Sequence, residues 1–113
     1  EWKYACLAGV ADVVFWGKRD DPELFVWYEE NASGQPHPGI EHVRQGNAFG
    51  LVDMLGNLDE MVLLGDGNLK RMGGSWCSML SECTVTNSRG CEATAYSFSL
   101  GLRVCRALPE TLH

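Results

Sequence analysis

Glycine-centred turns divide this chain into short apolar runs, and this division limits the folds that it can adopt. Glycine accounts for 13 of the 113 residues, and its freedom to adopt left-handed backbone favours turns over long regular elements. Gly65-Asp66-Gly67-Asn68 predicts a tight turn. Residues 71–76 predict a strand that is broken by glycines where the backbone comes close to another part of the molecule, and residues 100–105 predict a short strand. Residues 1–10 predict a short helix that stops at Gly9. We therefore expect an α+β fold in which loops outweigh helices and strands.

Length and charge exclude several classes of partner. The length fits one domain, residues 1–113. The 9 Lys and Arg residues against 15 Asp and Glu give a net charge of −6, so we expect neither nucleic acid nor an anionic membrane surface as partner. No apolar run approaches the roughly 20 residues that cross a bilayer, so we expect no membrane span. The first residue is Glu1 rather than Met, which indicates a chain that begins within a longer sequence.

The cysteines leave three readings open. An odd number of cysteines leaves at least one thiol unpaired within the chain. They can be buried reduced thiols, one disulfide with three free thiols, or can include a reactive or metal-binding pair. Because no C-x-x-C and no zinc-like Cys/His spacing is present, a structural zinc site is not expected. The five cysteines are Cys6, Cys77, Cys83, Cys91 and Cys105.

We expect the large aromatic side chains to lie in the core rather than to stack on a ligand, because buried aromatic area is a main source of stability in a small domain. Residues 11–16 predict a short strand or a buried extended segment beside them. The aromatic residues expected in the core are Trp16, Phe25, Trp27, Tyr28, Phe49 and Trp76.

Six segments in a fixed order carry a family resemblance. They read EWKYA (1–5), WYEEN (27–31), HP (37–38), NAFGLVDMLGN (47–57), GGSW (73–76) and GLRV (101–104). In this order and spacing they resemble the formylglycine-generating enzyme (sulfatase-modifying factor) family. The resemblance implies a C-type-lectin-like fold, rich in loops around a small twisted sheet. It covers the C-terminal part of that domain, which implies the N-terminal part of the same domain as a partner.

The resemblance also implies a test for oxidase activity. The family's oxidase uses O₂ and a copper ion held by two thiolates to convert a substrate-protein cysteine to formylglycine, which activates sulfatases. Its two cysteines stand three and eight residues after the serine that matches Ser75. The second position matches Cys83, but the first falls on Ser78, with Cys77 one residue early. The candidate catalytic residues are thus Cys83, Cys77 and Ser75, with Cys77 and Cys83 as copper ligands under this hypothesis.

A calcium site is implied at the turn that follows Gly56. In the family, the matching Gly-Asn-x-x-Glu turn supplies oxygen ligands to calcium, a cation that prefers carboxylate, amide and carbonyl oxygens. Here Asn57 and Glu60 would supply side-chain oxygens, and Gly56 and Leu58 backbone carbonyls. The alternative is that Asn57 and Glu60 cap and brace the turn without a metal.

A second functional hypothesis is a ligand- or protein-binding module without redox chemistry. The tryptophan pair of the family motif is replaced in Leu58-Asp59-Glu60-Met61, which removes an aromatic wall of the enzyme pocket. Residues 76–100 are rich in small polar side chains, which paratopes use for adaptable contacts; in family members diversified by retroelements, this stretch carries the variable positions. We expect such a non-oxidase module, with a protein or a small molecule as ligand and the oxidase as the alternative. The candidate contacts are Trp76, Ser78, Thr84, Thr86, Asn87, Arg89 and Tyr96.

Overall fold

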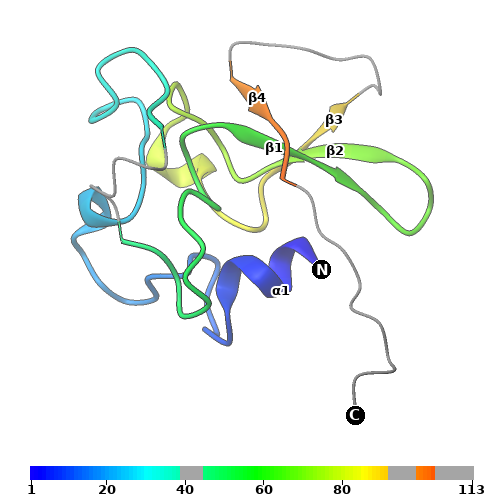
Figure 1. Ribbon diagram of the computed structural model, residues 1–113, viewed down its shortest axis with the longest axis horizontal. Helices are drawn as coiled ribbons and strands as arrows, with labels where there is room; N and C mark the ends of the chain where they lie inside the picture. Colours follow the sequence, from blue (N-terminus) through cyan, green and yellow to red (C-terminus); the bar gives the residue numbers. More distant parts are fainter. Residues whose placement is uncertain (39–44, 92–98, 104–113) are drawn as a thin grey trace.

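The computed structural model describes residues 1–38, 45–91 and 99–103, and its regular elements are short (Figure 1). They confirm the predicted α+β class with loops in the majority. Along the described chain they are α1 (Trp2–Leu7), the 3-10 helix η1 (Pro22–Leu24), β1 (Asp59–Leu63), β2 (Leu69–Met72), the 3-10 helix η3 (Leu80–Glu82), β3 (Ser88–Cys91) and β4 (Leu100–Gly101).

The helix at the start of the chain is confirmed, and its end has a local cause. Ala8 adopts a left-handed conformation with φ 50°, and its N–H donates to the carbonyl of Tyr4. Gly9 follows with φ 94°, a conformation that glycine adopts without a steric penalty. None of the helices in the described part of the chain is both long and apolar enough to cross a membrane.

The four strands form one mixed sheet in the order β3-β2-β1-β4. β1 and β2 form an antiparallel hairpin whose turn closes through Leu64 N–H and the Asn68 carbonyl, 2.9 Å apart. This confirms the turn predicted at residues 65–68. β4 lies parallel to β1 on the other edge, and β3 pairs antiparallel with β2. The predicted strand at 100–105 is described only to residue 103, and β4 accounts for its first two residues.

The strand predicted for residues 71–76 is broken at its glycines, as expected, and β2 ends at Met72. Gly73 and Gly74 adopt φ angles of 96° and 73°, which direct the chain out of the sheet. A side chain at Gly73 would also collide with the Met54 carbonyl, since an added Cβ would lie 2.8 Å from it. The glycines therefore end the strand and bring the loops at residues 54 and 73 into backbone contact.

The aromatic predictions have mixed outcomes. Phe25, Trp27 and Tyr28 are buried, as predicted, whereas Phe49 is 51% exposed. Phe49 projects from a turn that the Asn47 side chain holds together, since Asn47 Oδ1 accepts the N–H groups of Phe49 and Leu51. Trp16 and Trp76 are half-buried, and residues 11–16 form bends and a turn rather than a strand. The main core cluster is Cys6, Phe15, Phe25, Val26, Tyr28, Met54, Leu55, Cys83 and Val85.

The two faces of the sheet carry different chemistry. Side chains alternate between the faces along a strand, so Glu60 and its neighbour across the hairpin, Met72, lie on one face. Glu60 accepts a hydrogen bond from the Trp2 indole, which joins this face to α1. Arg71 and Arg89 are paired directly across β2 and β3 and lie on the opposite face. This second face carries charged residues of the candidate site.

Candidate functional site

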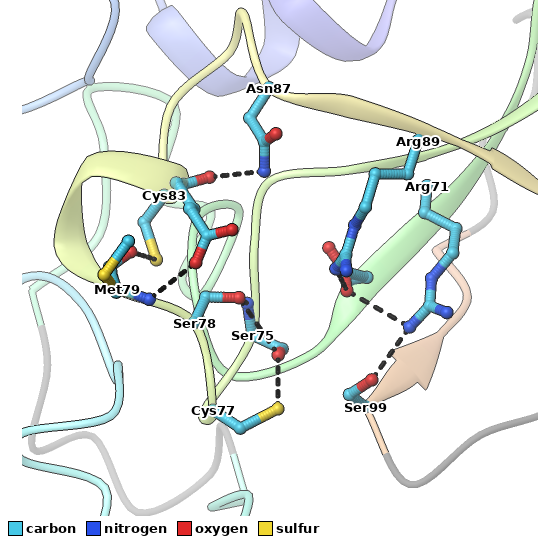
Figure 2. A network of polar contacts seen from close by, with 11 residues as sticks. Arg71, Ser75, Cys77, Ser78, Met79, Cys83, Asn87, Arg89 and Ser99 are labelled. Carbon is cyan, nitrogen blue, oxygen red and sulfur yellow. Dashed lines mark hydrogen bonds and ion pairs between the residues drawn. The ribbon is translucent and has the colours of Figure 1, made fainter.

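The Gly73-Gly74-Ser75 segment leads into a turn built on two buried serines. Ser78 Oγ accepts the Ser75 N–H at 2.9 Å, and the Ser75 carbonyl accepts the Ser78 N–H at 3.1 Å. Ser75 Oγ lies 3.3 Å from both Ser78 Oγ and Cys77 Sγ (Figure 2). Ser78, where the family's oxidase has its first cysteine, is therefore part of the scaffold of this turn.

Cys83 is a buried thiol at the end of η3. Its side chain is fully buried, and its Sγ lies 3.7 Å from the Met79 carbonyl, to which it donates. Gly74 packs directly against it, because a Cβ added at Gly74 would lie 2.9 Å from Cys83 Sγ. Burial, assisted by the negative charges of Asp59 and Glu82, raises the pKa of the Cys83 thiol to about 12.

The structure does not bring the two candidate copper ligands together. Cys77 is exposed and Cys83 is buried, and both are free thiols. In Figure 2 their sulfur atoms point in different directions, with Ser75 and Ser78 between them. Copper(I) binds thiolates that converge on the ion, so this arrangement does not fit a two-thiolate copper site. Within residues 1–38, 45–91 and 99–103, no group of three or more His, Cys, Asp or Glu side chains is placed to hold a metal ion.

A charged cluster beside this turn joins three strands of the sheet. Asp59, fully buried at the start of β1, accepts through Oδ2 from Arg89 Nη2 at 2.7 Å and from Arg71 Nη2 at 3.2 Å. Arg71 Nη2 also donates to Ser99 Oγ at 2.8 Å. Two buried atoms of the cluster, Asp59 Oδ1 and Arg71 Nε, have no hydrogen-bond partner among the described residues.

Of this cluster, the sequence pattern pointed only to Arg89, as a candidate ligand contact, and gave no role to Arg71 or Asp59. One signal was present, since Asp59 and Glu60 interrupt an otherwise apolar stretch that runs from Leu58 to Leu64. A carboxylate at a strand position that faces the interior requires a partner, and an arginine elsewhere in the sequence could supply the positive charge. Which of the arginines it is depends on strand register, which the sequence pattern did not define.

The residues proposed for calcium form a brace made of protein groups. Asn57 Oδ1 accepts the His37 N–H at 2.8 Å, and Asn57 Nδ2 donates to the His37 carbonyl at 2.8 Å. Glu60 Oε1 accepts from Trp2 Nε1 and Arg103 Nε, and Oε2 accepts from Arg103 Nη2. The side-chain oxygens of Asn57 and Glu60 are thus directed at protein donors, and in this arrangement they do not fit a calcium ion. Gly56 and Leu58 lie in the same turn, beside a cavity of about 300 Å³ that Leu58 and Arg103 help to line.

Of the remaining candidate contacts, Trp76 lies within the serine turn, and Thr84, Thr86 and Asn87 lie between that turn and β3. Thr84 Oγ1 and Thr86 Oγ1 are 3.1 Å apart at the surface, and Asn87 Nδ2 donates to the Glu82 carbonyl at 2.8 Å. Trp76 is half-buried, and its N–H donates to the Asn57 carbonyl at 2.8 Å. Tyr96 lies outside the described residues. Of the candidate contacts, Ser78 is thus used inside the serine turn, Arg89 belongs to the Asp59 cluster, and the two threonines and Asn87 lie on the chain that connects the two.

The family model described as a sulfatase-modifying factor enzyme 1-like domain matches residues 1–108. A solved structure, Treponema denticola variable protein 1, superposes with a TM-score of 0.76 at 21% sequence identity, over 90% of this chain and 43% of that one. At this identity the likeness establishes the fold, and it confirms the lectin-like fold class expected from the sequence. The chain spans less than half the length of that structure. A comparison with curated proteins finds no match.

Proposed function

This chain belongs to the sulfatase-modifying factor enzyme 1-like family, and from that premise we propose that it is a non-oxidase member: a ligand- or protein-binding module on a lectin-like scaffold. Membership alone does not select the chemistry, because one fold serves several functions and the chemistry depends on the site. The proposal therefore depends on the residues around Ser75.

The observation that carries the proposal is the separation of Cys77 from Cys83. A two-thiolate copper site requires two cysteines that converge and lose their protons. Cys83 is sealed against Gly74 and the Met79 carbonyl, while Cys77 faces the solvent. Ser78, at the position that would complete the pair, uses its hydroxyl oxygen to accept the Ser75 N–H. These contacts support a structural role for the segment.

The polar segment beside β3 supports a binding role. In it, the hydroxyl groups of Thr84 and Thr86 form an exposed pair, and the half-exposed Arg89 follows in β3. Short polar side chains and an arginine supported by a rigid scaffold are typical of adaptable binding surfaces. The sheet and the serine turn supply that rigid support.

Anaerobic Cu(I) titration of the reduced protein tests the proposal. We expect no tight equivalent of copper that depends on both Cys77 and Cys83. Cys77→Ala and Cys83→Ala report on the candidate pair, and Cys6→Ala is the matched control, since Cys6 is another fully buried free thiol. One tight equivalent that disappears in both test variants, but not in the control, would contradict the proposal and favour the copper- and O₂-dependent oxidase.

We also propose that the N-terminal part of the same domain packs on the groove between α1 and β1. This partner is the one that the family resemblance implies, and the matched structure is longer than this chain, which covers 43% of it. The groove has a volume of about 560 Å³, its lining includes Trp2 and Met54, and two of its side chains, Tyr4 and Leu63, are 72% and 69% exposed.

Adding the N-terminal part of the domain in trans should raise the unfolding midpoint of this chain. Leu63→Asp should abolish the rise and Met79→Asp, at an exposed residue outside the groove lining, should not. An equal rise in both variants would reject this surface.

A further inference from the structure

Two arginines are placed directly opposite each other on neighbouring strands. Arg71 of β2 and Arg89 of β3 are register partners in the antiparallel pair. Like charges at directly opposed positions destabilise a strand pair. Asp59 contacts both guanidinium groups but balances only one of the two positive charges. The cluster of Asp59, Arg71 and Arg89 therefore has an excess positive charge, on a chain whose net charge is −6.

The pairing inside this cluster is incomplete. Both arginines donate to the same oxygen, Asp59 Oδ2, while Asp59 Oδ1 and Arg71 Nε are buried without a hydrogen-bond partner in the described part of the structure. A guanidinium and a carboxylate can form two parallel hydrogen bonds in a fork arrangement. If Asp59 paired in this way with Arg71 alone, Oδ1 and Nε would both be satisfied, and Arg89 would not be needed for it.

The two arginines differ in their access to solvent. The Arg89 side chain is 50% exposed, the Arg71 side chain 20% and the Asp59 side chain 1%. β3, which carries Arg89, is at the edge of the described sheet. A ligand that approaches this edge meets Arg89 first, with Arg71 behind it and Asp59 enclosed.

We propose that Arg89 binds an anionic oxygen group of the ligand, and that Asp59 then pairs with Arg71 alone. The inference rests on the proposed binding function and names the ligand chemistry for that site. The group is an oxyanion, either a carboxylate or a phosphate, which accepts two N–H groups from one guanidinium. Because the chain carries a net charge of −6, one isolated anionic group is favoured over a polyanion such as nucleic acid.

Thermal unfolding of the full chain in matched salts tests the proposal. The probes are sodium succinate and inorganic phosphate, each compared with sodium chloride at equal ionic strength. A ligand that binds the folded state raises the unfolding midpoint, so we expect succinate or phosphate to raise it above the value in chloride. Whichever probe gives the larger rise identifies the carboxylate or the phosphate class.

Two variants assign the effect to Arg89. In Arg89→Gln we expect the anion-dependent rise to disappear, with an increase in Kd of about tenfold or more for the loss of charge-assisted hydrogen bonds. Arg19→Gln is the matched control, because Arg19 is 54% exposed and pairs with Asp21 at 2.6 Å in another part of the molecule. The control removes the same charge and should keep the wild-type response.

A third variant tests the competition with Asp59. Asp59→Asn removes the internal carboxylate that now contacts Arg89, so it should lower the Kd for the anion severalfold. Equal midpoints in all three salts, or an equal anion response in wild type and Arg89→Gln, would overturn the proposal. This result is independent of copper binding at Cys77 and Cys83, which tests the proposed function itself.

Discussion

At the scale of single residues, the two cysteines next to the serine turn should differ sharply in reactivity. The thiolate is the reactive form of a cysteine, and the raised pKa and burial of Cys83 suppress it. We expect iodoacetamide at pH 8 to modify Cys77 in the native protein and to leave Cys83 and Cys6 intact. Peptide mass spectrometry measures this directly, with urea-unfolded protein as the control in which all three react. Equal rates for Cys77 and Cys83 in native protein would show that the Cys83 site opens readily.

The same burial predicts a loss of stability in alkali. Burial is the main reason that the pKa values of Cys6 and Cys83 rise to about 12. Above about pH 9 these thiols ionise in the unfolded chain but stay protonated in the folded one. The unfolded state is then favoured, by about 1.4 kcal/mol per pH unit for each thiol. Urea unfolding at pH 8, 9 and 10 should show the free energy of unfolding falling with pH, and in Cys83→Ala this fall should be less steep. A slope unchanged in Cys83→Ala would contradict this assignment.

Some of the site was predictable from single residues. Counting from Ser75 located Cys83 and identified Ser78 as the departure from the oxidase pattern, because these positions lie in one short segment with a fixed spacing. The Asp59–Arg71 pair was not predictable, since it depends on which strands are neighbours. The exposure of Phe49 was missed for a similar reason, because the Asn47 side chain defines the direction of that turn.

At the scale of elements, the helices and strands of the described chain are short, and direct backbone contacts between loops connect much of the fold. Gly56 donates its N–H to the Gly73 carbonyl at 2.8 Å, and the next N–H, from Asn57, donates to the Trp27 carbonyl at 2.8 Å. Three loops thus meet with almost no side chain between them. The sequence predicted turns at several glycines, but which loops cross is a tertiary property that local patterns do not encode.

Gly56→Ala should therefore be far more damaging than an alanine at an ordinary glycine turn. An added Cβ would lie 2.4 Å from the Trp27 carbonyl oxygen, and the φ of Gly56 is 74°. Gly67→Ala is the control, since Gly67 has φ 85° in the β1–β2 turn with nothing within 4 Å. We expect a loss of about 1 kcal/mol in the control and at least about 3 kcal/mol in Gly56→Ala, measured by urea unfolding. Similar losses in the two variants would mean that the loops can separate at little cost.

At the scale of the whole molecule, Glu60 connects parts that are distant in the sequence. Its carboxylate joins Trp2 of α1 and Arg103, which follows β4, to β1. We expect Glu60→Gln to lower the free energy of unfolding by about 2 kcal/mol, because the partly buried Arg103 loses its charged partner. Lys18→Gln is a surface control, at a side chain that is 98% exposed, and should have little effect.

The Glu60 brace gives a sharp test of the calcium site that the family resemblance implies at this turn. Arg103 already supplies the positive charge that faces Glu60, so we expect millimolar calcium to leave the unfolding midpoint unchanged relative to magnesium. Isothermal titration with calcium gives a second readout. A calcium-specific rise in the midpoint that is lost in Glu60→Gln would instead support the ion and require Glu60 to turn away from Arg103.

From the parallel pairing of β4 with β1 we expect the sheet to form in a particular order. The β1–β2 hairpin needs only a short local turn, whereas β4 joins β1 from about 40 residues further along the chain and must close a long loop first. During synthesis on the ribosome, β4 is also the last strand of the described residues to emerge. Until it does, the free edge of β1 exposes unpaired backbone groups that can pair with another nascent chain. Expression conditions that slow the completion of this chain should therefore favour its aggregation.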